Sequence, residues 1–160
     1  MKEEPGAQHE WLQQMLGDWE AKFESQMKPD APPEKSTGKE SVRSVGALWV
    51  MGEGHAAMPD GVPAVMYITL GFDPRKQRFV GTWIGSMMSH LWVYDGELDP
   101  TGKILTLTAE GPAMTDPKKY GQYRDVIEFT SEGHRLLTSL YLGDDGNWTE
   151  FMRAIYRRVK

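Results

Sequence analysis

Charged and aromatic side chains on the late predicted strands have the greatest capacity for chemistry. Arg124 and Glu150 each lie near the centre of a strand-like run, and Tyr141 lies on the strand between them. If Arg124 and Glu150 point inward, they are buried charges that must pair or hold a polar ligand. With Tyr141 they would then form a site for a small substrate. If they point outward, they are ordinary solvent-facing strand charges, and the sequence leaves both alternatives open.

Other chemistries have less support. The acids near apolar stretches could supply a general acid–base pair, but the sequence gives no distances between them; they are Glu53, Glu110, Asp125, Glu128 and Glu150. None of the four histidines belongs to a close His-x-His or His-x-x-x-His pair, so no metal site is expected. Without cysteine there is no thiol catalysis, thiolate metal site or disulfide.

Composition excludes several broad function classes. The chain has 160 residues and a net charge of −5, which indicates one domain and argues against nucleic acid or an anionic membrane as partner. Residues 1–7 are expected to form a disordered tail, and they lack the basic and apolar regions of a secretory signal. No run approaches the ~20 apolar residues of a membrane span. A cytoplasmic, single-domain protein is expected.

The elements that position these side chains are almost all strands. Residues 8–16 place Trp11, Leu12, Met15 and Leu16 on one helical face, and Gly17 follows at the expected C-terminal cap. Residues 27–35 hold three prolines and should form an irregular loop. Ten strands are predicted at 18–26, 36–46, 48–58, 63–72, 77–86, 89–98, 103–111, 121–130, 134–142 and 147–158. Their short, turn-rich connections predict an all-β, up-and-down antiparallel barrel with the helix at one end.

The interior of a barrel of about ten strands is either filled by side chains or wide enough for a small ligand cavity. The six Trp, six Tyr and five Phe residues are enough to line or to fill its lumen. Several strands are apolar on both faces, so the alternation alone does not fix which face points inward. The lumen candidates are Trp83, Tyr67, His90, Arg124, Tyr141 and Glu150.

Four segments in order carry a resemblance to a known family: HEWLQQMLGDWE, LGFDPRKQRFVGTWIGSM, YRDVIEF and DGNWTEFMRAIYRR. Together they are similar to a bacterial family of lipocalin-like (calycin-type) proteins, number 1579 in the domain-of-unknown-function series. The family carries no established activity, so the resemblance implies a fold. An acidic residue often follows Thr-Trp-x in that family, where this chain has Gly85, so any role of that acid is missing here.

The lipocalin resemblance also implies roles for particular residues. In Leu16-Gly17-Asp18-Trp19, Trp19 corresponds to the Trp that packs across the closed barrel end beneath a late arginine, here Arg153 or Arg157. Fatty-acid carriers of similar shape hold a carboxylate with inward Arg and Tyr residues. A related group of ten-stranded barrels binds haem through one histidine, which makes haem at His90 or His134 an alternative to the expectation of no cofactor.

Three functions remain open at this point. The first is a barrel that binds a small apolar or amphipathic molecule in its lumen. The second is an oligomeric scaffold, for example a homodimer, that buries outward-facing Trp49, Trp92 or Trp148. The third is an enzyme that uses the lumenal residues proposed above.

Overall fold

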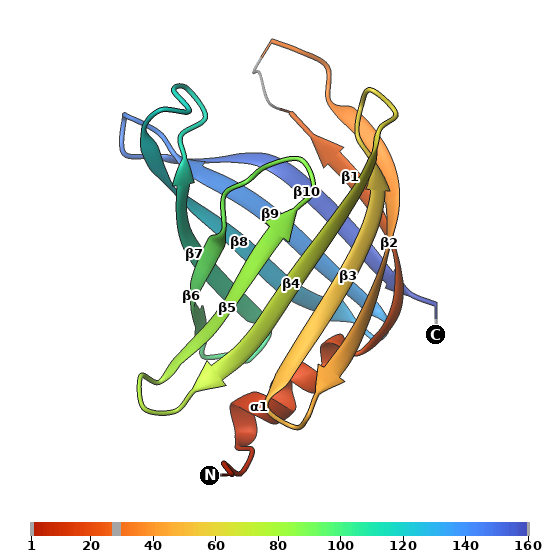
Figure 1. Ribbon diagram of the computed structural model, residues 1–160, viewed down its shortest axis with the longest axis vertical. Coiled ribbons are helices and arrows are strands. Elements are labelled where there is room, and N and C mark those ends of the chain that lie inside the picture. The colour runs from red at the N-terminus through yellow and green to blue at the C-terminus, as the bar shows by residue number, and fades with distance from the viewer. Residues whose placement is uncertain (1, 27–29, 160) are drawn as a thin grey trace.

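The computed structural model describes residues 2–26 and 30–159, which form a closed antiparallel β-barrel with a short helix at one end (Figure 1). Helix α1 (Ala7–Leu12) continues into the 3-10 turn η1 (Gln13–Met15). Within the described residues the ten strands are β1 (Gly17–Ser25), β2 (Glu34–Val45), β3 (Trp49–Ala57), β4 (Pro63–Asp73), β5 (Arg78–Gly85), β6 (Trp92–Leu98), β7 (Ile104–Pro112), β8 (Tyr120–Ser131), β9 (His134–Leu142) and β10 (Trp148–Arg158).

Every strand pairs with its neighbour in the chain, and β1 pairs with β10 to close the barrel. Local turn chemistry sets this order. Between β6 and β7, for example, Asp99 accepts the backbone N–H groups of Lys103 and Ile104, while Gly102 adopts φ 74°. The predicted up-and-down barrel with a short N-terminal helix is confirmed.

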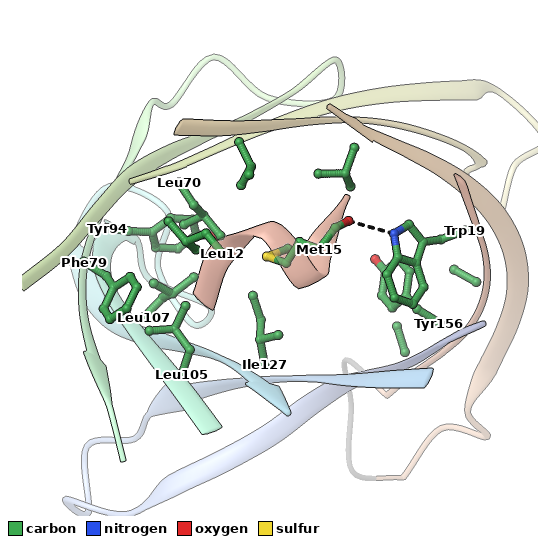
Figure 2. Packing of buried hydrophobic residues seen from close by; sticks show 14 of the residues in the cluster. Leu12, Met15, Trp19, Leu70, Phe79, Tyr94, Leu105, Leu107, Ile127 and Tyr156 are labelled. Atoms are coloured by element: carbon green, nitrogen blue, oxygen red, sulfur yellow. Dashed lines mark hydrogen bonds between the residues drawn. The ribbon is translucent and has the colours of Figure 1, made fainter. Parts of the chain in front are cut away.

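The helix plugs one end of the barrel. Leu12 and Met15 are fully buried, and Figure 2 shows Met15 near the middle of the barrel, with its carbonyl accepting a 2.9 Å hydrogen bond from the Trp19 indole. The Trp11 indole donates to the Gly102 carbonyl at 2.6 Å. A six-residue helix is not stable by itself, so these contacts hold it in place.

His9 ties the same helix to β4. Its Nδ1 accepts the Gly6 backbone N–H at 2.9 Å, which leaves Nε2 to donate to the Phe72 carbonyl at 2.9 Å. Glu3 also lies 2.9 Å from Arg75, and Ala7 already belongs to the helix. Of the tail expected over residues 1–7, Met1 lies outside the described residues, as do residues 27–29 of the expected loop.

Packing is not uniform along the barrel axis. Fully buried side chains gather near the helix and include Trp19, Leu70, Phe79, Leu105, Leu107 and Ile127 (Figure 2). Away from the helix, inward-facing residues such as Trp83 and Trp92 keep part of their surface accessible. We call this end, where β1 ends, β2 begins and the β3–β4, β5–β6, β7–β8 and β9–β10 connections lie, the open end. No helix in the described part of the chain has the length and apolar character to cross a bilayer.

Candidate functional site

A group of polar side chains lies inside the barrel, in the middle of an otherwise apolar lumen. We call it the lumenal polar cluster, and its members are Glu40 of β2, Tyr94 of β6, Asp125 of β8, Arg135 and Ser139 of β9, and Tyr156 of β10. Strand alternation aims each of them inward, since every one shares a face with residues of the buried core. The cluster has two halves, one around Arg135 and one around Asp125.

Arg135 forms the cationic half. Its guanidinium pairs with the Glu40 carboxylate, and the two side chains are 3% and 12% exposed. The same group lies 3.8 Å from the Tyr156 ring centroid and 4.6 Å from that of Trp19, which adds cation–π attraction. The Nε of Arg135 has no hydrogen-bond partner among the described residues.

Asp125 forms the second half. The Tyr94 hydroxyl donates to its Oδ2 at 2.5 Å, and the Ser139 hydroxyl donates to its Oδ1 at 2.6 Å. Desolvation raises the pKa of Asp125, opposed by the hydrogen bonds from Ser139 and Tyr94. Burial, with the nearby Asp125 charge, holds the pKa of Tyr94 well above its usual value, so this phenol remains a donor. Burial likewise raises the pKa of Tyr156.

The cluster surrounds a small interior cavity of about 50 Å³. Apolar side chains complete its wall: Met15, Ile68, Trp83, Leu107, Ile127 and Leu137. Ile68, Trp83 and Leu137 keep partial accessibility, whereas Met15 and Leu107 are fully buried. Trp83 lies near the end of β5 that reaches the open end, whereas the buried Met15 of the helix region closes the other side.

Two of the residues predicted to line the lumen face it. Trp83 lines the cavity next to Ile68, its cross-strand partner. Tyr141 lies nearer the open end, 6.0 Å from Phe151, and lines a separate pocket of about 280 Å³ between the β7–β8 and β9–β10 connections. Gly85 also faces the lumen, and a side chain there would collide with the Trp83 ring 2.6 Å away. A ligand role for Trp83 and Tyr141 remains a prediction.

The prediction that Tyr67, Arg124 and Glu150 line the lumen is wrong. Tyr67 alternates with inward-facing Ile68, and its hydroxyl donates to Glu53 on the outer face at 2.8 Å. Arg124 stacks on the outward-facing Trp148 ring at 4.0 Å. Glu150 is exposed and pairs with Arg153 at 2.8 Å. Because Arg124 and Glu150 lie outside the barrel, they form no lumenal constellation with Tyr141.

The barrel-closing arrangement around Trp19 also needs one correction. Trp19 is fully buried beneath arginines, but these are Arg158, at 4.4 Å, and Arg135. Arg158 additionally donates to the carbonyls of Leu16 and Gln14. Arg153 and Arg157 point outward, toward Glu150 and Glu20. Tyr156 faces inward, so strand alternation places Arg158 inside and Arg157 outside.

The haem alternative does not fit the structure. His90 lies before β6 at the rim of the open end, where its Nε2 contacts the Glu110 carbonyl at 2.8 Å. His134 lies at the β8–β9 turn, with Nδ1 3.2 Å from the Glu132 carbonyl. Neither histidine lines the interior cavity, and about 50 Å³ cannot hold a macrocycle. Among the described residues, no group of three or more acidic or histidine side chains could hold a metal ion.

Sequence reasoning missed most of the lumenal polar cluster. Asp125 was one of five acids without an assigned face, although it shares strand parity with Ile127 and Phe129. Arg135 and Ser139 share parity with Leu137 in the same way. A strict period-two reading of β8 and β9 would have found these three residues. Glu40 carries no such signal, because most residues of β2 are polar or exposed.

Comparisons with known proteins agree with this geometry. The family described as "Protein of unknown function (DUF1579)" matches residues 4–158. The chain belongs to the DUF1579 family. No curated protein matches it in sequence. The predicted membership of domain-of-unknown-function family 1579 is therefore confirmed.

Solved structures show how widely this barrel shape is shared. This DUF1579 protein resembles Rv2717c from M. tuberculosis with 14% identity and a TM-score of 0.67, covering 98% of this chain and 100% of that one. It resembles the S-type phycobiliprotein lyase CPES from Guillardia theta with 12% identity and a TM-score of 0.60, covering 97% and 94%. EF1p2_mFAP2b bound to DFHBI gives 14% identity and a TM-score of 0.50, covering 94% and 98%. At these identities the likeness shows a shared fold alone.

The raised pKa of Asp125 makes a testable prediction about stability. The folded state holds the proton to a higher pH than the unfolded chain, so the stability contributed by protonated Asp125 is present below pH ~4. It is lost as the pH rises through the folded-state pKa. Asp125→Asn, which keeps partners for the Tyr94 and Ser139 hydroxyls, removes this loss. The free energy of unfolding of the variant minus that of wild type should therefore be larger at pH 8 than at pH 4.

Urea unfolding at both pH values measures this difference. Glu128→Gln is the matched control, since it removes one negative charge from the outer face of the same strand. If the free energy of unfolding changed by the same amount between pH 4 and pH 8 in Asp125→Asn and in wild type, the prediction would be contradicted.

Proposed function

We propose that this protein binds a small amphipathic molecule, which enters from the open end and places its polar group in the cavity at the lumenal polar cluster. One observation carries this proposal: a partly accessible apolar lumen leads to a cavity walled by charged and hydroxyl groups. Ligand sites commonly combine an apolar wall with a few convergent polar groups.

The polar cluster is better explained by binding than by stability. Replacing a buried ion pair with well-packed apolar residues is often neutral or stabilising, so the Glu40–Arg135 pair is not needed for a strong core. The Asp125 carboxyl also keeps acceptor capacity beyond its bonds from Tyr94 and Ser139, and a donor group of a ligand could use it. The cluster therefore offers unused hydrogen-bonding capacity at the end of an accessible path.

The size of the cavity limits the ligand. About 50 Å³ holds a polar group or a few water-sized volumes, far less than a benzene-sized site of about 150 Å³. The apolar part of the ligand must then extend from the cavity toward the open end, past Trp83. A short chain meets these requirements, and a bulky ring system does not.

The competing scaffold function has narrower support. Trp49 is 42% exposed on the outer face of β3, whereas Trp92 packs inward against Gly111 and Trp148 lies beneath Arg124. One exposed tryptophan is ordinary for a soluble surface. A homodimer and a cytoplasmic location stay predictions.

A paired substitution tests lumenal binding. Wild-type protein labelled with ¹⁵N is titrated with 1-hexanol, hexylamine and hexanoate, and amide shifts are followed. At least one probe should give saturable shifts centred on β8, β9 and β10. Leu137→Trp fills the cavity and should abolish them, whereas Leu136→Trp on the outer side of the same strand should preserve them. Equal shifts in the two folded variants would overturn the proposal.

A further inference from the structure

The charges around the cavity do not balance. Glu40 and Asp125 are both acids that line it, and Arg135 is the one cation among its lining residues. The Arg135 charge is already matched by Glu40, and aromatic rings cover it. Once this pair is counted, Asp125 remains as an uncompensated carboxyl group.

The partners of Asp125 are hydroxyls. No Asp125 salt bridge occurs within residues 2–26 and 30–159, and its hydrogen bonds come from Tyr94 and Ser139. A carboxylate has about four acceptor sites, so these two bonds leave capacity on both oxygens. A deeply placed carboxylate without a cation is unfavourable, and a bound cation would relieve that cost.

The remaining wall also suits a cation. The aromatic residues Trp83 and Tyr94 line the same cavity as Asp125, and aromatic faces attract ammonium groups when water is excluded. An anionic group would meet the opposite conditions. It would compete with Glu40 for the Arg135 guanidinium and would face Asp125 across a cavity of about 50 Å³.

We propose that the polar group recognised in the lumen is cationic, a protonated primary amine on a short apolar chain, and that its ammonium pairs with Asp125. This inference rests on the proposed function, because it names the chemistry of the ligand that the lumen binds. The ammonium occupies the cavity, and the chain extends toward the open end along Trp83.

The proposal implies a pH dependence. The charged and titratable groups around Asp125 are Tyr94, Glu40, Arg135 and Tyr156. Since desolvation raises the pKa of Asp125, amine binding must expel its proton when the pH is low. Amine affinity should therefore increase as the pH rises through this pKa, until the amine itself loses its proton at high pH.

Three probes of equal chain length provide the test: hexylamine, 1-hexanol and hexanoate, each titrated into wild type, Asp125→Asn and the outer-face control Glu128→Gln. In wild type, hexylamine should bind about tenfold more tightly than 1-hexanol, the contribution of one charge-assisted hydrogen bond. Asp125→Asn should remove this preference, and Glu128→Gln should retain it. Circular dichroism confirms that each variant is folded.

The outcomes separate the two proposals. Equal lumenal affinity for hexylamine and 1-hexanol in wild type would leave the binding function standing and overturn the amine assignment. Tightest binding of hexanoate would also overturn it, in favour of Arg135 as the recognition group. A failure of all three probes to bind folded wild-type protein would overturn both. If Asp125→Asn does not fold, the wild-type preference and its pH dependence decide the assignment.

Discussion

Replacing Trp19 with alanine is expected to lower the free energy of unfolding by about 3–5 kcal/mol, the usual cost of removing a fully buried tryptophan. Its indole is 1% exposed, donates to the Met15 carbonyl and lies beneath Arg158 and Arg135. The substitution leaves a cavity between the helix and the barrel wall, and it deprives two guanidinium groups of an aromatic face. Urea denaturation followed by circular dichroism measures the loss.

Trp49→Ala is the matched control for this experiment. It removes a side chain of the same type from the outer face of β3, where 42% of the residue is already exposed. We expect less than half of the Trp19→Ala effect. Similar losses in the two variants would show that Trp19 does not hold the plugged end of the barrel together.

Replacing Arg135 with methionine is expected to lower the free energy of unfolding by ~3–5 kcal/mol, because it leaves the Glu40 carboxylate in the lumen without its cation. Both members of this pair are almost entirely buried, and Arg135 also packs on Tyr156. The double variant Glu40→Met, Arg135→Met should recover most of the loss, since it removes both charges. Thermal and urea unfolding of the single and double variants complete the cycle.

The pair Arg157–Glu20 provides the surface control. Its nitrogen–oxygen distance is 2.6 Å, yet both side chains are more than half exposed. Arg157→Met should therefore cost under about 1 kcal/mol. If the Arg135 substitution proved equally mild, or if the double variant were no more stable than Arg135→Met, the lumenal pair would not be acting as a desolvated unit.

The fold could be predicted from sequence because its signals are local. Turn residues such as Asp99 and Gly102 mark the strand ends, and the structure places the predicted strand boundaries within three residues. Gly17 and Trp19 mark the passage from helix to first strand. These signals depend on residues that are adjacent in the chain, so they can be recognised without knowledge of the tertiary contacts.

The site could not be predicted in the same way, because it depends on strand facing. An error of one residue in the alternation assigns a side chain to the wrong face of the barrel wall. Arg124 and Asp125 are adjacent in the chain, yet the first lies outside the barrel and the second inside. On β10 the register shifts between Glu150 and Met152, so counting back in twos from inward-facing Tyr156 places Glu150 on the wrong side. A bulge of this kind has no clear sequence marker here.

The pairing of β1 with β10 has a consequence for how this chain folds. Trp19 needs Arg135, Tyr156 and Arg158 around it, and all three lie more than a hundred residues away in the chain. Closing so long a loop is entropically slow, and contacts of this kind lengthen folding times. During synthesis, β1 must wait for β9 and β10 before its face is covered. The packing of the lumen around Trp19 and the pairing of β1 with β10 should consequently form together, as the last step of folding.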